Sequence, residues 1–308
     1  MKYLVTGAAG FIGSCIARKL IQQGHQVVTI DNLSTGKESA IPQGCRFIRG
    51  DVQEEVIVDS LQTEHFDSIL HIAGQSSGEI SFEKPVYDLQ TNAQSTLLLL
   101  NLARKTGCKH FVYASSMSVY GDHPANPKVD EGTATVPKSF YAVGKLASEN
   151  YMRIYSSMFG IHCTALRFFN VYGIGQNLDN LKQGMASIYL AMALKDHHIL
   201  VKGAKDRFRD FVNVTDVVDA VLSAAEKCTG YHVYNVCTGV PTTVGKVIEG
   251  ICSNLTFQVD VEYTTGTPGD QHGIYGDWDK ICRELGWSPK IDFATGIRDM
   301  VAWAKQQM

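Results

Sequence analysis

Hydrophobic and polar positions in the first 165 residues follow two patterns that take turns along the chain. Short runs rich in β-branched residues are separated by longer stretches whose apolar residues recur at i, i+3 and i+4. The short runs predict strands, and the longer stretches predict amphipathic helices. This alternation is typical of βαβ units, so we expect an α/β fold with a doubly wound parallel sheet. Strands are expected at 2–6, 26–30, 45–49, 67–73, 110–115 and 162–167, and helices at 11–23, 53–62, 85–106 and 141–159.

Beyond about residue 166 the pattern loosens, and no linker rich in Pro, Gly or Ser separates the two halves. We expect a smaller, mostly C-terminal α/β domain that exchanges elements with the first. The first domain would span 1–166 with contributions from about 208–236, and the second would comprise 167–207 and 237–308. Predicted elements are Gly-rich turns at 172–177, a helix near 183–195, a strand pair around 198–214, a helix at 215–227, a strand at 232–236, and helices at 243–254 and 293–306.

Composition narrows the class of protein. The 308 residues are 44% hydrophobic with a net charge of -3, which allows a large core and excludes a disordered chain. No Lys/Arg-rich run marks a nucleic-acid or anionic membrane surface, so neither is an expected partner. No apolar run approaches the roughly 18 residues of a membrane span. The eight cysteines are scattered without CxxC pairs or metal-ligand spacing, so we expect reduced thiols, no metal site and a cytoplasmic protein.

A glycine motif, Thr6-Gly-Ala-Ala-Gly-Phe-Ile-Gly13, lies between the first predicted strand and the first predicted helix. Missing side chains let the backbone turn sharply and approach a pyrophosphate, whose charge meets N–H groups and the positive end of the helix dipole. A tight strand-to-helix connection is the alternative interpretation. The position of the motif favours a dinucleotide site.

Acidic residues follow at the ends of the next two predicted strands. Asp31 comes 18 residues after Gly13, where a carboxylate can bind both ribose hydroxyls of the adenosine half and repel a 2′-phosphate. This favours NAD over NADP, although a turn formed with Asn32 is the alternative. Asp51 and Val52 either cap the next helix or line an adenine pocket.

A candidate acid/base pair lies at the start of the helix predicted at 141–159. Tyr141 and Lys145 are four residues apart, so both face the same side of that helix. A nearby ammonium favours phenolate and is expected to lower the Tyr141 pKa from about 10 toward neutrality, which yields a base for a sugar hydroxyl. Such pairs also occur by chance. The run Ser115-Ser-Met-Ser-Val-Tyr-Gly121 follows a strand end and adds a hydroxyl that can orient a substrate oxygen.

Together these motifs resemble the extended short-chain dehydrogenase/reductase family, in particular nucleotide-sugar 4-epimerases of the UDP-glucose 4-epimerase type. The resemblance implies a Rossmann fold, an NAD cofactor bound by the first domain, a nucleotide-sugar site in the second, and a nucleotide-diphosphate sugar, with a UDP-sugar favoured, as substrate. It covers nearly the whole chain, through TGxxGxxG at 6–13, Asp31, Asp51-Val52, HIAGQ at 71–75, the Ser motif at 115–121, YxxxK at 141–145, LRFFNVYG at 166–173, RDFVNVTDV at 209–217, YNVCTG at 234–239 and GD at 269–270.

The resemblance assigns roles residue by residue. Ser116 matches the catalytic hydroxyl, Tyr141 the acid/base, and Lys145 the residue that tunes Tyr141 and holds the nicotinamide ribose. Phe168 and Phe169 would pack near the nicotinamide. The implied cofactor-binding residues are Gly7, Gly10, Phe11, Ile12, Gly13, Asp31, Asn32, Asp51, Val52, Ile72, Ala73, Gln75, Asn92, Tyr141, Lys145 and Phe168, and the implied substrate-binding residues are Ser116, Ser118, Asn170, Arg209 and Asp270.

Arg209 and His71 also have simpler structural interpretations. Asn170 and Arg209 would contact the phosphates, but Arg209 can also form a surface ion pair with Asp210. His71 ends an apolar run and is expected to be a buried structural histidine rather than a catalyst.

The residues after the catalytic hydroxyl distinguish the reactions of the family. Dehydratases of this type carry an Asp-Glu pair where this chain has Met117 and Ser118, and UDP-glucuronate decarboxylases typically carry a Glu at the second position. We therefore expect an NAD-dependent epimerase that inverts C4 through a transient 4-keto intermediate. A 4-ketoreductase or dehydrogenase of the same family is the main alternative. A decarboxylase and a non-catalytic NAD sensor are weaker ones.

Two further features bear on substrate and assembly. Thr267 stands where the family often has an Arg on the diphosphate, and Ile274 falls near a position where some relatives carry a larger aromatic. An N-acetylated or otherwise altered hexose is therefore a further candidate substrate.

The helices predicted at 85–106 and 141–159 match those that pair across a two-fold axis in relatives, so a homodimer through a four-helix bundle is expected, unless both of their faces are buried within one chain.

Overall fold

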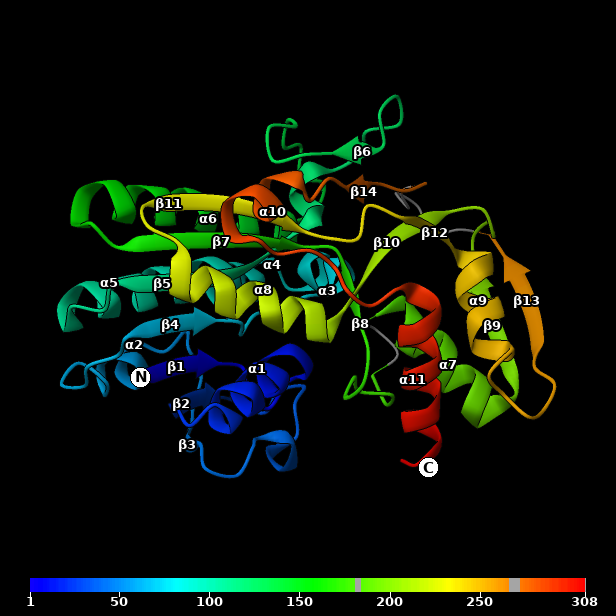
Figure 1. Ribbon diagram of the computed structural model, residues 1–308, viewed down its shortest axis with the longest axis horizontal. Helices are drawn as coiled ribbons and strands as arrows, with labels where there is room; N and C mark the ends of the chain where they lie inside the picture. The colour runs from blue at the N-terminus through cyan, green and yellow to red at the C-terminus, as the bar shows by residue number, and fades with distance from the viewer. Residues whose placement is uncertain (181–183, 266–271, 308) are drawn as a thin grey trace.

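The computed structural model describes residues 1–180, 184–265 and 272–307 and is built on one large sheet (Figure 1). All pairings in this seven-stranded sheet are parallel, in the order β11-β7-β5-β4-β1-β2-β3. The doubly wound α/β prediction is confirmed. The strands are β1 (Lys2–Thr6), β2 (Gln26–Asp31), β3 (Arg46–Arg49), β4 (Ser68–His71), β5 (His110–Ser116), β7 (His162–Phe168) and β11 (Tyr231–Val236).

Helices cover both faces of this sheet because successive strand residues point to opposite sides. Tyr3 and Val5 of β1 pack with α1 and α8, whereas Leu4 between them packs with α2, α5 and α6 on the other face. Each face therefore has its own apolar core. The helices are α1 (Phe11–Gln22), α8 (Val214–Lys227) and α10 (Asp279–Leu285) on one side, and α2 (Glu55–Asp59), α5 (Ser95–Thr106) and α6 (Phe140–Phe159) on the other.

The helix predicted at 85–106 is present but is not uniform. It comprises α4 (Pro85–Leu89), a π-helical turn η2 (Gln90–Gln94) and α5, preceded by a short helix α3 (Gly78–Glu83) that the pattern did not predict. A π-helical turn is frequent at functional sites, and this one carries Asn92.

Strand register brings the carboxyl ends of the strands together. Thr6 pairs with His71, His71 with Tyr113, and Ser116 with Phe168. The strand order reverses at β1, and ligands of open α/β sheets bind in the crevice at such a reversal. The motifs at the ends of β1, β2, β4, β5 and β7 therefore share one edge.

A smaller region lies beyond the large sheet, on the right of Figure 1. Its apolar core is formed by α7, α9 and α11 with strands of two small sheets. One sheet is β12-β10-β8 and the other pairs β9 with β13. The elements are β8 (Asn170–Tyr172), α7 (Met185–Asp196), β9 (His198–Lys202), β10 (Phe208–Asn213), β12 (Pro241–Thr243), α9 (Val244–Cys252), β13 (Asp260–Thr264) and α11 (Phe293–Lys305).

The predicted strand pair around 198–214 is wrong in its pairing. Both strands exist, but β9 pairs with β13 and β10 pairs with β8 and β12. Each strand finds its partner far along the chain, which a local pattern cannot reveal. The strand at 208–213 therefore lies outside the large sheet, whereas β11 lies within it.

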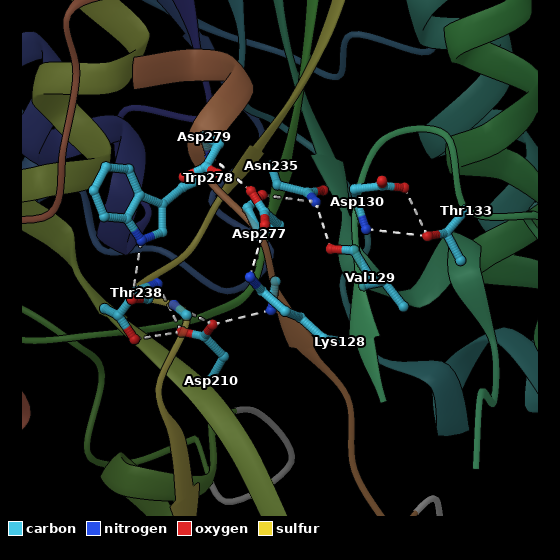
Figure 2. A network of polar contacts seen from close by, with 12 residues as sticks. Lys128, Val129, Asp130, Thr133, Asp210, Asn235, Thr238, Asp277, Trp278 and Asp279 are labelled. Atoms are coloured by element: carbon cyan, nitrogen blue, oxygen red, sulfur yellow. Dashed lines mark hydrogen bonds and ion pairs between the residues drawn. The ribbon is translucent and has the colours of Figure 1, made fainter. Parts of the chain in front are cut away.

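A polar network joins a third small sheet, which has two strands, to the large sheet (Figure 2). The Asn235 side chain at the end of β11 donates to the carbonyls of Val129 (3.1 Å) and Asp277 (3.2 Å), and an ion pair of 2.7 Å joins Lys128 to Asp277. These contacts fix a two-stranded sheet of β6 (Lys128–Val129) and β14 (Tyr275–Gly276) against the large one.

Three general features of the described part of the chain concern its cysteines, membrane spans and metal sites. All eight cysteines are free, four of them buried and four partly so. Among the described residues, no helix combines the length and apolar character needed to cross a membrane, and no group of His, Cys, Asp or Glu is arranged to hold a metal ion.

Candidate active site

The glycine motif forms the turn between β1 and α1. Gly7 has a φ of +77°, and a Cβ there would lie 2.9 Å from the Ala73 Cα, while a Cβ on Gly13 would lie 2.1 Å from the Gly7 carbonyl oxygen. The helix begins at Phe11 with Gly10 as its N-cap, without a capping side chain and without an acid in the first turn. Its free N–H groups and positive dipole end are therefore open to an anion.

A threonine that the motif analysis did not single out holds this turn to β4. The Thr6 hydroxyl accepts hydrogen bonds from the backbone N–H groups of Ile72 (3.1 Å) and Ala73 (3.0 Å) and contacts His71 Nδ1 at 2.9 Å. Burial lowers the pKa of His71 to about 3, so this imidazole is neutral. As expected, His71 is a buried structural residue.

The acids after β2 and β3 are both anchored. Asp31 accepts hydrogen bonds from the N–H groups of Ala9 (2.9 Å) and Leu33 (2.8 Å), which closes the glycine turn onto β2. Asn32 donates to Asp51 at 2.6 Å and so ties the ends of β2 and β3.

The alternative that Asp51 caps the next helix is wrong, because α2 begins at Glu55 with Glu54 as its N-cap. Asp51 instead accepts hydrogen bonds from the backbone and side chain of Gln53, both at 3.1 Å. Val52 beside it is buried.

Ser116, Tyr141 and Lys145 come together although they lie on β5 and α6. Ser139 caps α6 by accepting the Ala142 N–H, which places Tyr141 in the first turn. Lys145 Nζ donates to the Ala114 carbonyl at 2.9 Å and lies 5.7 Å from the centre of the Tyr141 ring. The Ser116 hydroxyl lies close enough to Tyr141 to lower the pKa of the phenol. A phenol, a hydroxyl and an ammonium therefore meet at the carboxyl edge of the sheet.

The titration of this trio differs from the expectation. Burial raises the pKa of Tyr141 to about 12 against the hydrogen bond with Ser116, and Asp88 raises it further. Burial also lowers the pKa of Lys145 to about 8, opposed by Asp88 and Glu149. The expected shift of Tyr141 toward neutrality is wrong for the protein alone, because desolvation outweighs the lowering effect of Ser116.

Gln75 and Asn92 lie beside the trio in a buried amide network. Gln75 Nε2 and Asn92 Nδ2 both donate to Asp88 Oδ1, at 2.7 and 3.1 Å, and Asn92 Nδ2 also donates to the Gln75 carbonyl at 2.9 Å. Sequence reasoning missed Asp88. Its signal was its position four residues before Asn92, which places both on one helix face.

The residues predicted to bind substrate extend from the trio toward the smaller region. Ser116 Oγ donates to Ser118 Oγ at 3.2 Å, and Phe168 is buried where β7 ends beside Ser116. Asn170 opens β8, and its Oδ1 is buried without a hydrogen-bond partner among the described residues. Gln176, which the sequence did not predict as a site residue, also has a buried Oε1 without a hydrogen-bond partner among the described residues.

Arg209 projects from β10 on the side away from Asp210. Its guanidinium donates to the carbonyls of Phe208 (2.7 Å) and His272 (3.3 Å), and burial together with nearby Arg207 lowers its pKa to about 10.

The alternative of an Arg209–Asp210 ion pair is wrong. Asp210 is fully buried and accepts hydrogen bonds from Thr238, Gly239 and Gly276 (Figure 2). Neighbouring strand residues point to opposite faces, so the two side chains diverge.

Two remaining positions complete the predicted site. Ile274 is buried with Phe169 in a small apolar cluster. Asp270 and Thr267 lie outside the described residues.

Comparisons with known proteins agree with this arrangement. Residues 3–237 match the model of the NAD dependent epimerase/dehydratase family. UDP-glucose 4-epimerase of Mycolicibacterium smegmatis is 32% identical over 313 residues, which cover 100% of this chain and 99% of the relative.

Two solved structures resemble the fold over the full chain. UDP-glucose 4-epimerase of Thermus thermophilus, solved with NAD, has a TM-score of 0.93 and 32% identity and is covered in full. UDP-N-acetylglucosamine 4-epimerase of Methanobrevibacter ruminantium, solved with UDP-N-acetylmuramic acid, has a TM-score of 0.93 and 28% identity, with 99% of it covered. The chain therefore belongs to the NAD-dependent epimerase/dehydratase family, whose cofactor is NAD.

Proposed function

We propose that the protein is an NAD-dependent nucleotide-sugar 4-epimerase, which inverts C4 of a nucleotide-diphosphate sugar through a transient 4-keto sugar. The observation that carries the proposal is the meeting of Ser116, Tyr141 and Lys145 at the carboxyl edge of the sheet, beside the glycine turn. A phenol held between a hydroxyl and an ammonium suits proton transfer at a sugar hydroxyl.

The residues present fit NAD. The uncapped start of α1 suits a pyrophosphate, and Asp31 suits a ribose without a 2′-phosphate. A Cβ on Gly74 would lie 2.7 Å from Asn92 Oδ1 and 3.2 Å from Lys145 Nζ. Both polar atoms therefore lie on the side of Gly74 where another residue would carry its side chain. When bound, NAD supplies a hydride acceptor and donor for C4 and a positive charge on its oxidised ring.

The chain's own groups handle the proton. Tyr141 takes the proton from the C4 hydroxyl when the hydride leaves, and gives it back when the hydride returns to the other face of the ketone. Ser116 holds the same oxygen, and the Lys145 ammonium stabilises the phenolate. Because the Tyr141 pKa is about 12 in the protein alone, the phenolate depends on positive charge that arrives with the oxidised cofactor.

For the substrate we propose a UDP-sugar. Arg209, Asn170 and Ser118 would contact its diphosphate and sugar, and Asp270 would complete the set. The two relatives with solved structures are named for UDP-glucose and for UDP-N-acetylglucosamine, so the sugar is to be found by experiment.

The test is an incubation of purified protein, without added cofactor, with UDP-glucose, UDP-N-acetylglucosamine, UDP-glucuronate and a non-uridine nucleotide sugar, followed by NMR. Inversion at C4 of at least one UDP-sugar is the expected result. Turnover that appears only with added NAD(H) or NADP(H) would instead assign a dehydrogenase or 4-ketoreductase. Absence of any turnover by protein that still binds NAD would assign a sensor.

We also propose a homodimer formed through the helical stretch 85–106, which begins with α4, and through α6. Val86 and Leu89 on α4 and Val143, Ile154 and Met158 on α6 are exposed apolar side chains, and a second copy would cover them in a four-helix bundle. Light scattering on purified protein should give twice the chain mass.

Two coarser features complete the proposal. The NAD-binding domain would comprise 1–166 and part of 208–236, and the nucleotide-sugar-binding domain would comprise the remainder. The eight free cysteines support a reducing, cytoplasmic location.

A further inference from the structure

Asp88 is a buried acid for which the proposed mechanism has no use. It has no exposed surface, and it lies on α4 against the α6 turn that joins Tyr141 to Lys145. A Cβ on Gly144, within that turn, would lie 3.6 Å from Asp88 Oδ2. Asp88 Oδ2 has no hydrogen-bond partner among the described residues. The carboxylate therefore faces the backbone that carries the acid/base pair.

The other oxygen of Asp88 helps to orient two amides, together with the Ser77 backbone at Gln75 and the Gln75 carbonyl at Asn92. Burial raises the pKa of Asp88, whereas the hydrogen bonds from Gln75 and Asn92 and the charge of Lys145 lower it. When ionised, the carboxylate only accepts hydrogen bonds, so Gln75 and Asn92 present their NH2 groups to Asp88 Oδ1. The Asn92 NH2 group also donates to the Gln75 carbonyl. Asn92 Oδ1 is thereby turned to the opposite side, where it and Lys145 Nζ border Gly74.

Several charged or titratable groups face the Lys145 ammonium. Asp88 comes from α4 and Glu149 from α6, and both raise the pKa of Lys145. The Tyr113 ring on β5 and the Tyr141 ring on α6 lie 4.7 and 5.7 Å from Lys145 Nζ. His71 on β4 is neutral.

The two acids near Lys145 differ in their other partners. Glu149 is held by Arg167 through two hydrogen bonds of 3.0 and 2.7 Å, so its charge is balanced within that pair. Asp88 has no ion-pair partner at contact distance among the described residues. It is thus the acid whose charge is available to the buried ammonium.

We propose that Asp88 is a positioning residue, which keeps Lys145 charged in its buried site and turns Asn92 Oδ1 toward the cofactor. Its role is to act through Lys145 and Asn92, without touching the reacting atoms. The inference rests on the proposed function for its consequence in catalysis, but its electrostatic part concerns the protein alone.

The test compares the wild type with Asp88→Asn, which keeps the shape and removes the charge. In protein labelled with ¹³C-lysine, the Lys145 signal is assigned by its loss in Lys145→Met and titrated by NMR. We expect a midpoint near pH 8 in the wild type, and a midpoint lower by roughly one unit or more in Asp88→Asn. NADH affinity should fall above the Lys145 midpoint in each protein, so its decline should begin at lower pH in the variant.

Two further variants separate charge from structural damage. Asp216→Asn makes the same change at another buried acid, on α8, and should leave the Lys145 midpoint unchanged. Asp88→Glu retains the charge, should keep the midpoint near 8, and serves as the test if Asp88→Asn does not fold.

The outcomes distinguish this inference from the proposed function. An unmoved Lys145 midpoint in folded Asp88→Asn, or a lowered one in Asp88→Glu, would overturn the inference whatever the activity. A lowered midpoint in Asp88→Asn with an earlier loss of NADH affinity would support it, even if the wild type inverted no sugar.

Discussion

The two walls of the candidate site bury charge in opposite ways. The cofactor wall, formed by the ends of β1 and β4 with α4 and α6, places the Lys145 ammonium among acids of opposite sign, Asp88 and Glu149. The proposed substrate wall, formed by β8, β10 and the residue before β10, places two like charges, Arg207 and Arg209, close enough for Arg207 to lower the pKa of Arg209, although Asp122 raises it.

This difference indicates what each wall requires from a ligand. Opposite charges balance one another, so the cofactor wall is organised before anything binds. Neighbouring guanidinium groups repel each other in a partly buried site, although Asp122 offsets part of this effect at Arg209, and a bound anion would lessen the repulsion further. A diphosphate is such an anion, and we therefore expect ligand charge to matter far more on the substrate wall.

The largest effect is expected from a substitution of Tyr141, the proposed acid/base on the cofactor wall. Tyr141→Phe should lower the rate of C4 inversion by about 10³-fold, because proton transfer typically contributes 10²- to 10⁴-fold. NADH affinity, measured by fluorescence titration, should fall by less than about tenfold, since only one hydrogen bond is lost. Tyr151→Phe on the same helix is the matched control and should retain full activity. Equal losses of rate and NADH affinity in Tyr141→Phe would contradict the assigned role.

A substitution of Arg209 tests whether the substrate wall binds UDP independently of the cofactor. Arg209→Ala should weaken UDP binding by up to about 100-fold, because hydrogen bonds to charged groups contribute roughly 1.5–3 kcal/mol. Calorimetric titration with UDP and with NADH should show this loss for UDP alone. Arg46→Ala, at the far edge of the sheet, is the control. Unchanged UDP affinity in Arg209→Ala would remove Arg209 from the proposed site.

The smallest expected effects test how the cofactor wall is held together. Thr6→Val removes the acceptor for two backbone N–H groups and should lower the free energy of unfolding by roughly 2–3 kcal/mol. Thr29→Val makes the same change on the neighbouring strand β2, where the hydroxyl is buried and has no hydrogen-bond partner among the described residues, and should raise that free energy by up to about 1 kcal/mol. Urea unfolding measures both. Equal changes in the free energy of unfolding for the two substitutions would contradict the role of Thr6 in holding the glycine turn to β4.

The same two walls differ in how well sequence predicts them. The strand at 2–6 coincides with β1, and the helix and strand that follow agree within one residue, because a glycine turn between a strand and a helix is a local signal. The sequence also predicted that the site trio would meet, from the Tyr141–Lys145 spacing, the strand end at Ser116 and the family resemblance.

The features that the sequence did not predict depend on contacts between residues far apart along the chain. The short strands β8 and β12 exist only because β10 lies between them, and a run of three residues carries no periodicity. The pKa of Tyr141 depends on burial by surrounding elements, and the position of Asp88 beside Gly144 depends on how α4 packs on α6. These features arise from packing, which a linear pattern does not contain.

We propose that a hydride leaves C4 and returns to the same carbon on the opposite face. This mechanism is tested with the UDP-sugar that the substrate panel identifies, labelled with deuterium at C4, and with purified protein in ordinary water without added cofactor. We expect the epimer to retain deuterium at C4, as followed by NMR and mass spectrometry. An epimer that carries hydrogen from solvent at C4 would contradict this mechanism.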